Sequence, residues 1–187
     1  HENHEWVLDV PKQLLIPGIE ISGPSSQTSM FINGLNSNME GFRADGDLDD
    51  NEDASGHSLE DTVQSAINRK GAVEGNLEYF DETKNKKYVL EEGKLPFFMH
   101  RERGILLDEY DYLIDSKPVC ASILDTVLTL MHCGIKQQEK GDYIFFYLPK
   151  LENSNEAKFW RDFFDEAVKI IHGLDGDKIK AIMLSLI

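Results

Sequence analysis

Charged side chains follow short apolar segments at two places in this sequence. Arg101 and Arg103 come directly after residues 95–100, and Lys150 and Glu152 come directly after residues 143–148. Two arginines and a lysine at one edge of a fold could hold a small carboxylate substrate, because a guanidinium binds a carboxylate in a bidentate fork. Ordinary solvated loop charge is the commoner explanation for such residues, and both interpretations stay open.

An acidic run over residues 45–53 raises the question of a calcium site. An EF-hand loop that began at Asp45 would need Gly at its sixth position and Glu at its twelfth, but Asp50 and Gly56 stand there. The EF-hand is therefore rejected, and residues 45–57 are predicted to form a solvated acidic loop.

The histidines and cysteines give no metal or nucleophile pattern. His100, His132 and His172 are scattered singly and are interpreted as structural. Cys120 and Cys133 are roughly 20 Å apart on one predicted helix, so they cannot form a disulfide within it. A reducing compartment is the simpler expectation.

Five short segments have strand character, and helical patterns separate them. Ser58 and Asn153 are predicted N-caps of two of the helices, and residues 76–90 are predicted to form an inserted hairpin. Apolar strands that alternate with helices predict a parallel sheet. The predicted strands span residues 18–23, 41–45, 95–100, 143–148 and 178–184, and a further long helix spans residues 119–138.

A parallel sheet can be open or closed into a barrel. No Gly-x-Gly-x-x-Gly turn follows the first strand, which argues against an open dinucleotide-binding sheet. The alternative is a (β/α)8 barrel, which takes about 250 residues. The 187 residues reach only a fifth core strand, so we expect one α/β domain over residues 1–187, a partial TIM barrel of about five parallel strands.

Composition limits the partners of the chain. The sequence has 19 Lys and Arg against 34 Asp and Glu, a formal charge of −15, which argues against direct binding of nucleic acid. Its 41% of hydrophobic residues is enough for a core. No apolar run of about 18 residues occurs, so no membrane insertion is expected.

Two groups of motifs resemble those of a known family. Residues 20–24 read Glu-Ile-Ser-Gly-Pro and residues 30–37 read Met-Phe-Ile-Asn-Gly-Leu-Asn-Ser. They are similar to the Val-Glu-Ile-Thr-Gly-Pro and Met-Val-Ile-Asn-Ala-Leu-Asn-Ser of malate synthases of the shorter plant, fungal and bacterial type. Residues 147–152, Tyr-Leu-Pro-Lys-Leu-Glu, with Glu156, Ala157 and Trp160, are similar to that family's Tyr-Leu-Pro-Lys-Met-Glu segment and the helix after it.

The resemblance implies a barrel with added domains that condenses acetyl-CoA with glyoxylate and then hydrolyses the thioester to give malate. In the family, Mg²⁺ held by a Glu and an Asp polarises glyoxylate, an Arg stabilises the developing negative charge, and a separate Asp is the base. Residues 101–104, Arg-Glu-Arg-Gly, correspond to the family's Arg-Pro-Arg-Gly. The resemblance therefore implies that Arg101 is the catalytic arginine, if the protein is active.

The chain also departs from the family. The family's Ala-Asp-Phe-Glu-Asp-Ser is compared with residues 44–49, Ala-Asp-Gly-Asp-Leu-Asp, which differ from it. An ungapped comparison of residues 181–187 with Ala-Thr-Val-Leu-Ile-Glu-Thr-Leu assigns Ser185 to the first magnesium ligand, and a hydroxyl is a poor substitute for that carboxylate. The second ligand and the base fall beyond residue 187. We expect no metal or other cofactor in this chain, and Mg²⁺ only if it is part of an active enzyme.

Two functions follow, and whether the chain is an enzyme stays open. The first is a truncated, non-catalytic malate synthase-like protein, a pseudoenzyme that acts as a structural subunit with other protein chains covering its open barrel edge. The alternative is a part of an active malate synthase of the glyoxylate cycle, with acetyl-CoA and glyoxylate as partners. We expect a mitochondrial location, with a peroxisomal, glyoxysomal or cytoplasmic location as alternatives; the absence of an initiator Met is compatible with removal of a presequence and equally with trimming.

Overall fold

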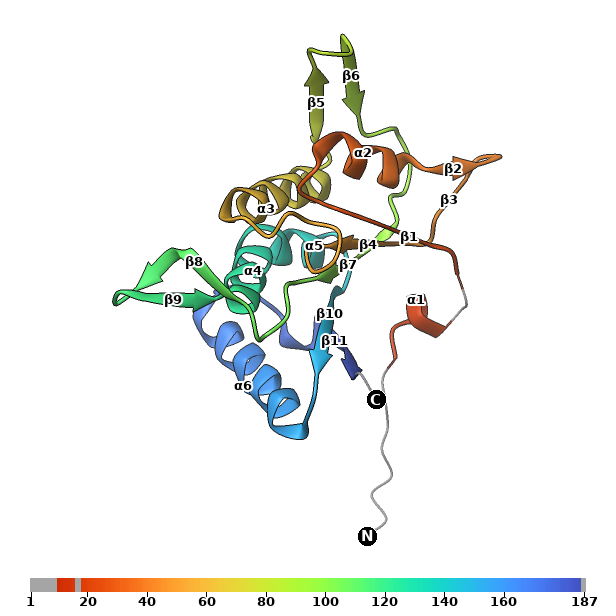
Figure 1. The fold of residues 1–187 in the computed structure, drawn as a ribbon. Coiled ribbons are helices and arrows are strands. Elements are labelled where there is room, and N and C mark those ends of the chain that lie inside the picture. The colour runs from red at the N-terminus through yellow and green to blue at the C-terminus, as the bar shows by residue number, and fades with distance from the viewer. Residues whose placement is uncertain (1–9, 16–17, 186–187) are drawn as a thin grey trace.

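A computed structural model describes residues 10–15 and 18–185 and contains a five-stranded parallel sheet (Figure 1). The strands are adjacent in chain order, β1-β4-β7-β10-β11, and every neighbouring pair is parallel. This is the progression of strands in a TIM-type barrel, so the predicted fold class, a partial barrel, is confirmed. The strands are β1 (Glu20–Gly23), β4 (Gly46–Asp50), β7 (Phe97–Arg101), β10 (Ile144–Leu151) and β11 (Ile179–Ser185).

Helices connect the strands of the sheet, as parallel pairing requires. Helices α3, α4 and α6 lie along the same side of the sheet (Figure 1). The long helix predicted over residues 119–138 is α4 followed by a five-residue π-helical turn and α5. The helices are α1 (Lys12–Leu15), α2 (Thr28–Asn36), α3 (Leu59–Glu74), α4 (Ala121–Thr129), the π turn (Leu130–Gly134), α5 (Ile135–Glu139) and α6 (Ser154–Ile170), and a 3₁₀ turn spans Gly176–Lys178.

Local sequence signals determine where two of these helices begin. The side chain of Ser58 accepts a hydrogen bond from the backbone N–H of Asp61 at 3.0 Å. The side chain of Asn153 accepts hydrogen bonds from the N–H groups of Asn155 and Glu156 at 2.9 and 3.2 Å. Both predicted N-caps are therefore confirmed, and each satisfies N–H groups that the first helical turn leaves unpaired.

Three antiparallel hairpins project from the sheet and helices. The β5–β6 hairpin lies within residues 76–90, and β8–β9 extends away from the sheet beside α4 (Figure 1). The β2–β3 and β8–β9 hairpins were not predicted from the sequence. The strands are β2 (Asn38–Met39), β3 (Phe42–Arg43), β5 (Glu78–Asp81), β6 (Lys86–Val89), β8 (Asp108–Ile114) and β9 (Lys117–Cys120).

The second core strand is not the predicted segment 41–45. Residues 42–43 belong to the small β2–β3 hairpin, where Glu40 and Gly41 turn the chain with positive φ angles of 54° and 87°. The core strand is β4, which starts at Gly46 and runs through the acidic segment. Strand β4 was not predicted because aspartates are uncommon in strands. In this strand, basic side chains stabilise the buried aspartates.

The acidic residues of this segment are not a solvated loop. Five acidic or amide side chains between residues 47 and 52 are at most 3% exposed, so the predicted solvation of residues 45–57 was wrong for its central part. Basic side chains from α3, β7 and β10 form ion pairs with Asp49, Asp50 and Glu52, which compensates for the hydration that these carboxylates lose. The buried residues are Asp47, Asp49, Asp50, Asn51 and Glu52.

The apolar core lies between the sheet and the helices. One cluster joins Ile144, Phe146 and Leu148 of β10 to Trp160 of α6. A second cluster joins α2 to the C-terminal part of α3 and the β5–β6 hairpin, with Phe31 and Ile32 at its centre. Burial of these side chains contributes roughly 1.5–3 kcal/mol each and fixes the helices against the sheet.

Within the described part of the chain, no helix combines the length and apolar character needed to cross a bilayer.

Candidate functional site

A group of charged side chains lies at the carboxyl edge of strands β4, β7 and β10. Nε of Arg101 donates a hydrogen bond to Oδ1 of Asp50 at 2.8 Å, and Nη2 of Arg101 pairs with both Asp50 and Asp53, the latter at 2.8 Å. Nζ of Lys150 pairs with Glu52 and lies 3.9 Å from Oδ1 of Asp53. We call these five residues the mouth cluster.

The strands themselves place the mouth cluster. Asp50 and Arg101 are the last residues of β4 and β7 and are register partners across that pair. Lys150 has a positive φ of 57°, at a shift in register between β10 and β11. The carboxyl ends of parallel strands meet at one edge, which is where barrel proteins build sites.

The ion pairs of the mouth cluster shift the pKa values of Asp50, Arg101 and Lys150 so that the charged forms are favoured. Burial alone would raise the pKa of Asp50, but the hydrogen bond from Arg101 holds it below its ordinary value. The hydrogen bond to Asp50 raises the pKa of Arg101, and the hydrogen bond to Glu52 raises that of Lys150. Arg101, Lys150 and Asp50 are therefore charged at neutral pH.

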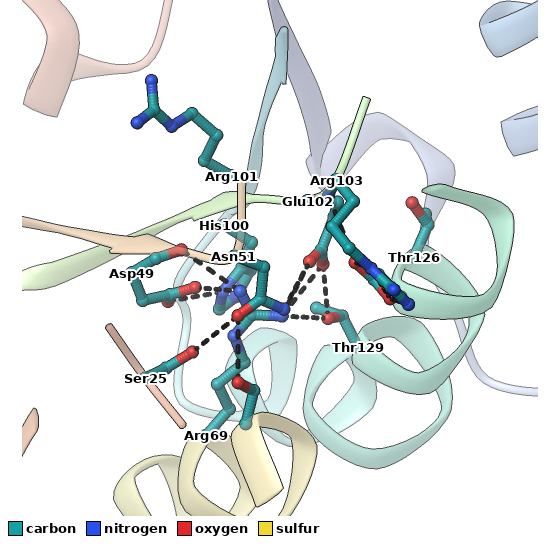
Figure 2. A network of polar contacts seen from close by, with 12 residues as sticks. Ser25, Asp49, Asn51, Arg69, His100, Arg101, Glu102, Arg103, Thr126 and Thr129 are labelled. Atoms are coloured by element: carbon teal, nitrogen blue, oxygen red, sulfur yellow. Dashed lines mark hydrogen bonds and ion pairs between the residues drawn. The ribbon is translucent and has the colours of Figure 1, made fainter. Parts of the chain in front are cut away.

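Arg101 has donor capacity left for a ligand. Its Nε and Nη2 are used by Asp50 and Asp53, whereas no described residue accepts a hydrogen bond from Nη1. The side chain is 17% exposed and points away from the buried residues around Glu102 (Figure 2). A carboxylate or oxyanion ligand could therefore bind to a guanidinium that is already held in place.

Arg103, predicted to bind substrate, is instead engaged by buried acids. Its Nε and Nη2 lie 3.0 and 2.8 Å from the carboxylate oxygens of Asp125, and Nη1 lies 2.9 Å from Oε2 of Glu109. Nη1 also donates to the carbonyl of His57 at 3.2 Å. These contacts connect the end of β7 to α4 and β8, so the geometry favours a structural role for Arg103.

Three further residues were predicted as site positions: Lys150, Glu152 and Ser185. Lys150 belongs to the mouth cluster, whereas the backbone N–H of Glu152 donates to Oε2 of Glu156 at the start of α6, at 2.7 Å. Ser185 ends β11 opposite Leu151. Counted from Ala181 without a gap, the family's glutamate falls on Leu186, which lies outside the described residues, and not on Ser185.

The strand boundaries also correct the comparison of the acidic motif. The spacing Asp-x-Glu-Asp of the family's Ala-Asp-Phe-Glu-Asp-Ser occurs at Asp50, Glu52 and Asp53, where β4 ends. The earlier placement at residues 44–49 preserved only the Ala and the first Asp. The acidic motif is therefore largely present, and all three of its carboxylates belong to the mouth cluster.

A buried network of polar side chains, which was not predicted from the sequence, lies next to Arg101 of the mouth cluster (Figure 2). Arg69 of α3 forms ion pairs with Asp49 of β4 and with Glu102, which follows β7. His100 lies 2.7 Å from Oδ2 of Asp49, and the hydroxyl of Thr129 donates to Glu102 at 2.6 Å. We call these five residues the buried network. The structural interpretation of His100 is confirmed.

Magnesium does not fit the described residues of this chain. No group of three or more His, Cys, Asp and Glu side chains in the described ranges is arranged to hold a metal ion. The carboxylates of the mouth cluster are already paired with Arg101 and Lys150. We therefore derive no chemical step through a metal here.

The parallel strands in chain order, with charged residues gathered at their carboxyl edge, define part of a TIM-type barrel. Residues 97–185 match the family model "Malate synthase, TIM barrel domain". The chain is 37% identical over 184 residues to glyoxysomal malate synthase of Brassica napus. The aligned residues cover 96% of this chain and 31% of that protein. The chain is 36% identical to malate synthase of Arabidopsis thaliana, over 94% of this chain and 30% of that protein.

A third relative, glyoxysomal malate synthase of Cucurbita maxima, is 35% identical over 96% of this chain and 31% of its own length. The chain is malate synthase-like over nearly its whole length. The match is a partial one, because the chain spans about a third of the length of these relatives.

Proposed function

We propose that this chain contributes five strands to a malate synthase barrel, in which Arg101 stabilises negative charge as acetyl-CoA condenses with glyoxylate. The observation that carries the proposal is the position of Arg101: it ends β7 and keeps one guanidinium nitrogen without a hydrogen bond to any described residue. The similarity of residues 101–104 to Arg-Pro-Arg-Gly supports the same role.

Arg101 is suited to this role because it is held before a ligand arrives. Asp50 binds Nε and Nη2 and so orients the guanidinium plane. A donor that is fixed in advance stabilises developing negative charge without reorganisation in the transition state. The metal ligands and the base that the resemblance implies lie outside the described residues, so the complete reaction and its Mg²⁺ are proposals for the whole protein.

The names of the relatives support a compartment. The proteins of Brassica napus and Cucurbita maxima are both named glyoxysomal. We therefore propose a peroxisomal or glyoxysomal location, within the glyoxylate cycle. No finding supports the mitochondrial expectation.

A non-catalytic role as a subunit of a larger assembly is the second candidate, and the face between α6 and β11 favours it. A groove of about 850 Å³ there is lined partly by apolar side chains, among them Phe164, Val168 and Met183. Met183 is 44% exposed. A partner chain that packed against β11 would cover these residues.

Release of coenzyme A by the gene product, with glyoxylate, acetyl-CoA and Mg²⁺, distinguishes the two candidates. Under the catalytic proposal, Arg101→Gln lowers kcat/KM by about 10²-fold or more, the typical effect of removing a donor to a developing oxyanion. Arg161→Gln, which changes an exposed arginine on α6, leaves the rate unchanged. A folded gene product that releases no coenzyme A rejects the catalytic proposal.

A further inference from the structure

A second cavity lies on the helix side of the sheet, away from the mouth cluster. It has a volume of about 310 Å³ and is formed by β1, α2 and β4. Ile21, Pro24, Met30 and Phe31 supply apolar walls, and Asp47 is the acidic residue among those that line it. We call it the Asp47 pocket.

Asp47 is an unusual residue to find in such a position. Its side chain is 3% exposed, and no described residue donates a hydrogen bond to its Oδ2. A buried carboxylate oxygen without a donor is costly and marks a position that a ligand could complete. Burial, and then the nearby charge of Asp49, raise the pKa of Asp47 well above its ordinary value.

The neighbouring cation cannot neutralise Asp47. Asp47 and Asp49 alternate with Leu48 on β4 and therefore face the same side of the sheet. Arg69 is already shared between Asp49 and Glu102. Three buried carboxyl groups therefore lie near one guanidinium, and burial raises the pKa of both Asp47 and Glu102. A positive charge beside Asp47 would favour its carboxylate form.

The wall opposite Asp47 leaves room for that charge. Gly34 of α2 lines the pocket, and a Cβ atom at Gly34 would lie 3.6 Å from Oδ1 of Asp47. The space in front of Oδ1 is open because residue 34 has no side chain. Apart from α2 itself, no other described atom lies within 4 Å of that Cβ position, so an ammonium nitrogen could approach Oδ1 beside it at the usual distance of about 2.8 Å.

We propose that the Asp47 pocket binds a small primary amine, with its ammonium group donating to Asp47 and its apolar body against Met30 and Phe31. The group of buried carboxyls favours a cation. The Asp47 carboxylate, to which no described residue donates a hydrogen bond, favours N–H donors at its accessible side, and the walls favour a short hydrocarbon chain. The site goes beyond the malate synthase proposal and does not depend on it.

Isothermal titration of the full chain with n-butylammonium at neutral pH tests the proposal. We expect saturable binding, with n-butyltrimethylammonium, which has the charge but no N–H donor, binding at least 10-fold more weakly. Asp47→Asn lowers the affinity at least 10-fold. Asp162→Asn removes one exposed acidic charge from α6 and serves as the matched control with unchanged affinity.

A second variant keeps the acid and changes only the space. Gly34→Ala adds a methyl group where the ammonium would approach Oδ1, and we expect it to weaken binding at least 5-fold while helix α2 is retained. This variant tests the site independently of Asp47→Asn, because it keeps the carboxyl group of Asp47. No saturable binding to the wild-type chain, or wild-type affinity in both pocket variants, overturns the proposal.

Discussion

Nη1 of Arg69 donates a hydrogen bond to Oε2 of Glu102 at 2.9 Å, although neither side chain is more than 2% exposed. Arg69 belongs to α3, and Glu102 follows β7 at the edge that carries Arg101. Burial alone would lower the pKa of Arg69, but the charges of Asp49 and Glu102 raise it. Arg69 therefore stays protonated inside the protein, whereas burial raises the pKa of Glu102.

Replacing Arg69 with Met should destabilise the fold by about 3–5 kcal/mol, because Asp49 and Glu102 would remain buried without their cation. Urea unfolding followed by circular dichroism measures the change. Lys158→Met removes one partner of the exposed pair with Asp162 and should cost at most about 1 kcal/mol. Similar costs for the two variants would contradict the buried-network assignment.

Asp47→Asn should stabilise the chain at neutral pH. The pKa of Asp47 is raised by burial, so the wild type gains unfolding free energy as the pH falls through that raised pKa toward the ordinary value of about 3.9. The advantage of Asn is therefore largest above the raised pKa and vanishes below about pH 3.9. Thermal unfolding of both chains across this range tests the sign, and an advantage that grew on acidification would refute it.

Asn153→Ala should cost about 1 kcal/mol, since the N–H groups of Asn155 and Glu156 lose their side-chain acceptor. Asn153→Asp keeps the acceptor and should retain the wild-type stability to within about 0.5 kcal/mol. Urea midpoints measure both values. Equal losses in the two variants would show that the cap itself does not stabilise α6.

The two cysteines should react at very different rates. Cys133 is fully buried and its thiol pKa is raised to about 12 by burial, whereas Cys120 is partly exposed. Iodoacetamide at pH 8 should label Cys120 at least 10-fold faster in the folded chain, because the thiolate is the reactive form. Mass spectrometry of peptides gives the two rates, and urea should remove the difference.

The apolar strands were predictable because their burial on both faces leaves a continuous hydrophobic run, as in residues 144–148. Strand β4 could not be predicted in this way, because Asp49 and Asp50 are stable in the interior only with Arg69 and Arg101 beside them. These partners are 20 or more residues away in the sequence. No local sequence pattern predicts an ion pair between residues so far apart.

The candidate site, like the fold, was predictable from the sequence only in part. The rule that chemistry gathers at the carboxyl ends of parallel strands correctly brought Arg101 and Lys150 to one edge. It could not separate Arg101 from Arg103, because the difference depends on Asp125 and Glu109, which reach Arg103 from α4 and β8. Side-chain neighbours from other elements decide which of two similar arginines is free.

The hydrogen bond between Asp49 and His100 has a consequence for how β4 aligns with β7. These two residues are register partners in the sheet, and a slip of one position would turn them to opposite faces. A slip of two positions along β4 would bring Asp47 or Asn51 opposite His100 and break the Arg69 pairs. The polar contact thus selects one alignment of two strands whose hydrophobic pattern alone is weak, and it fixes the distance along the sheet at which Asp50 meets Arg101.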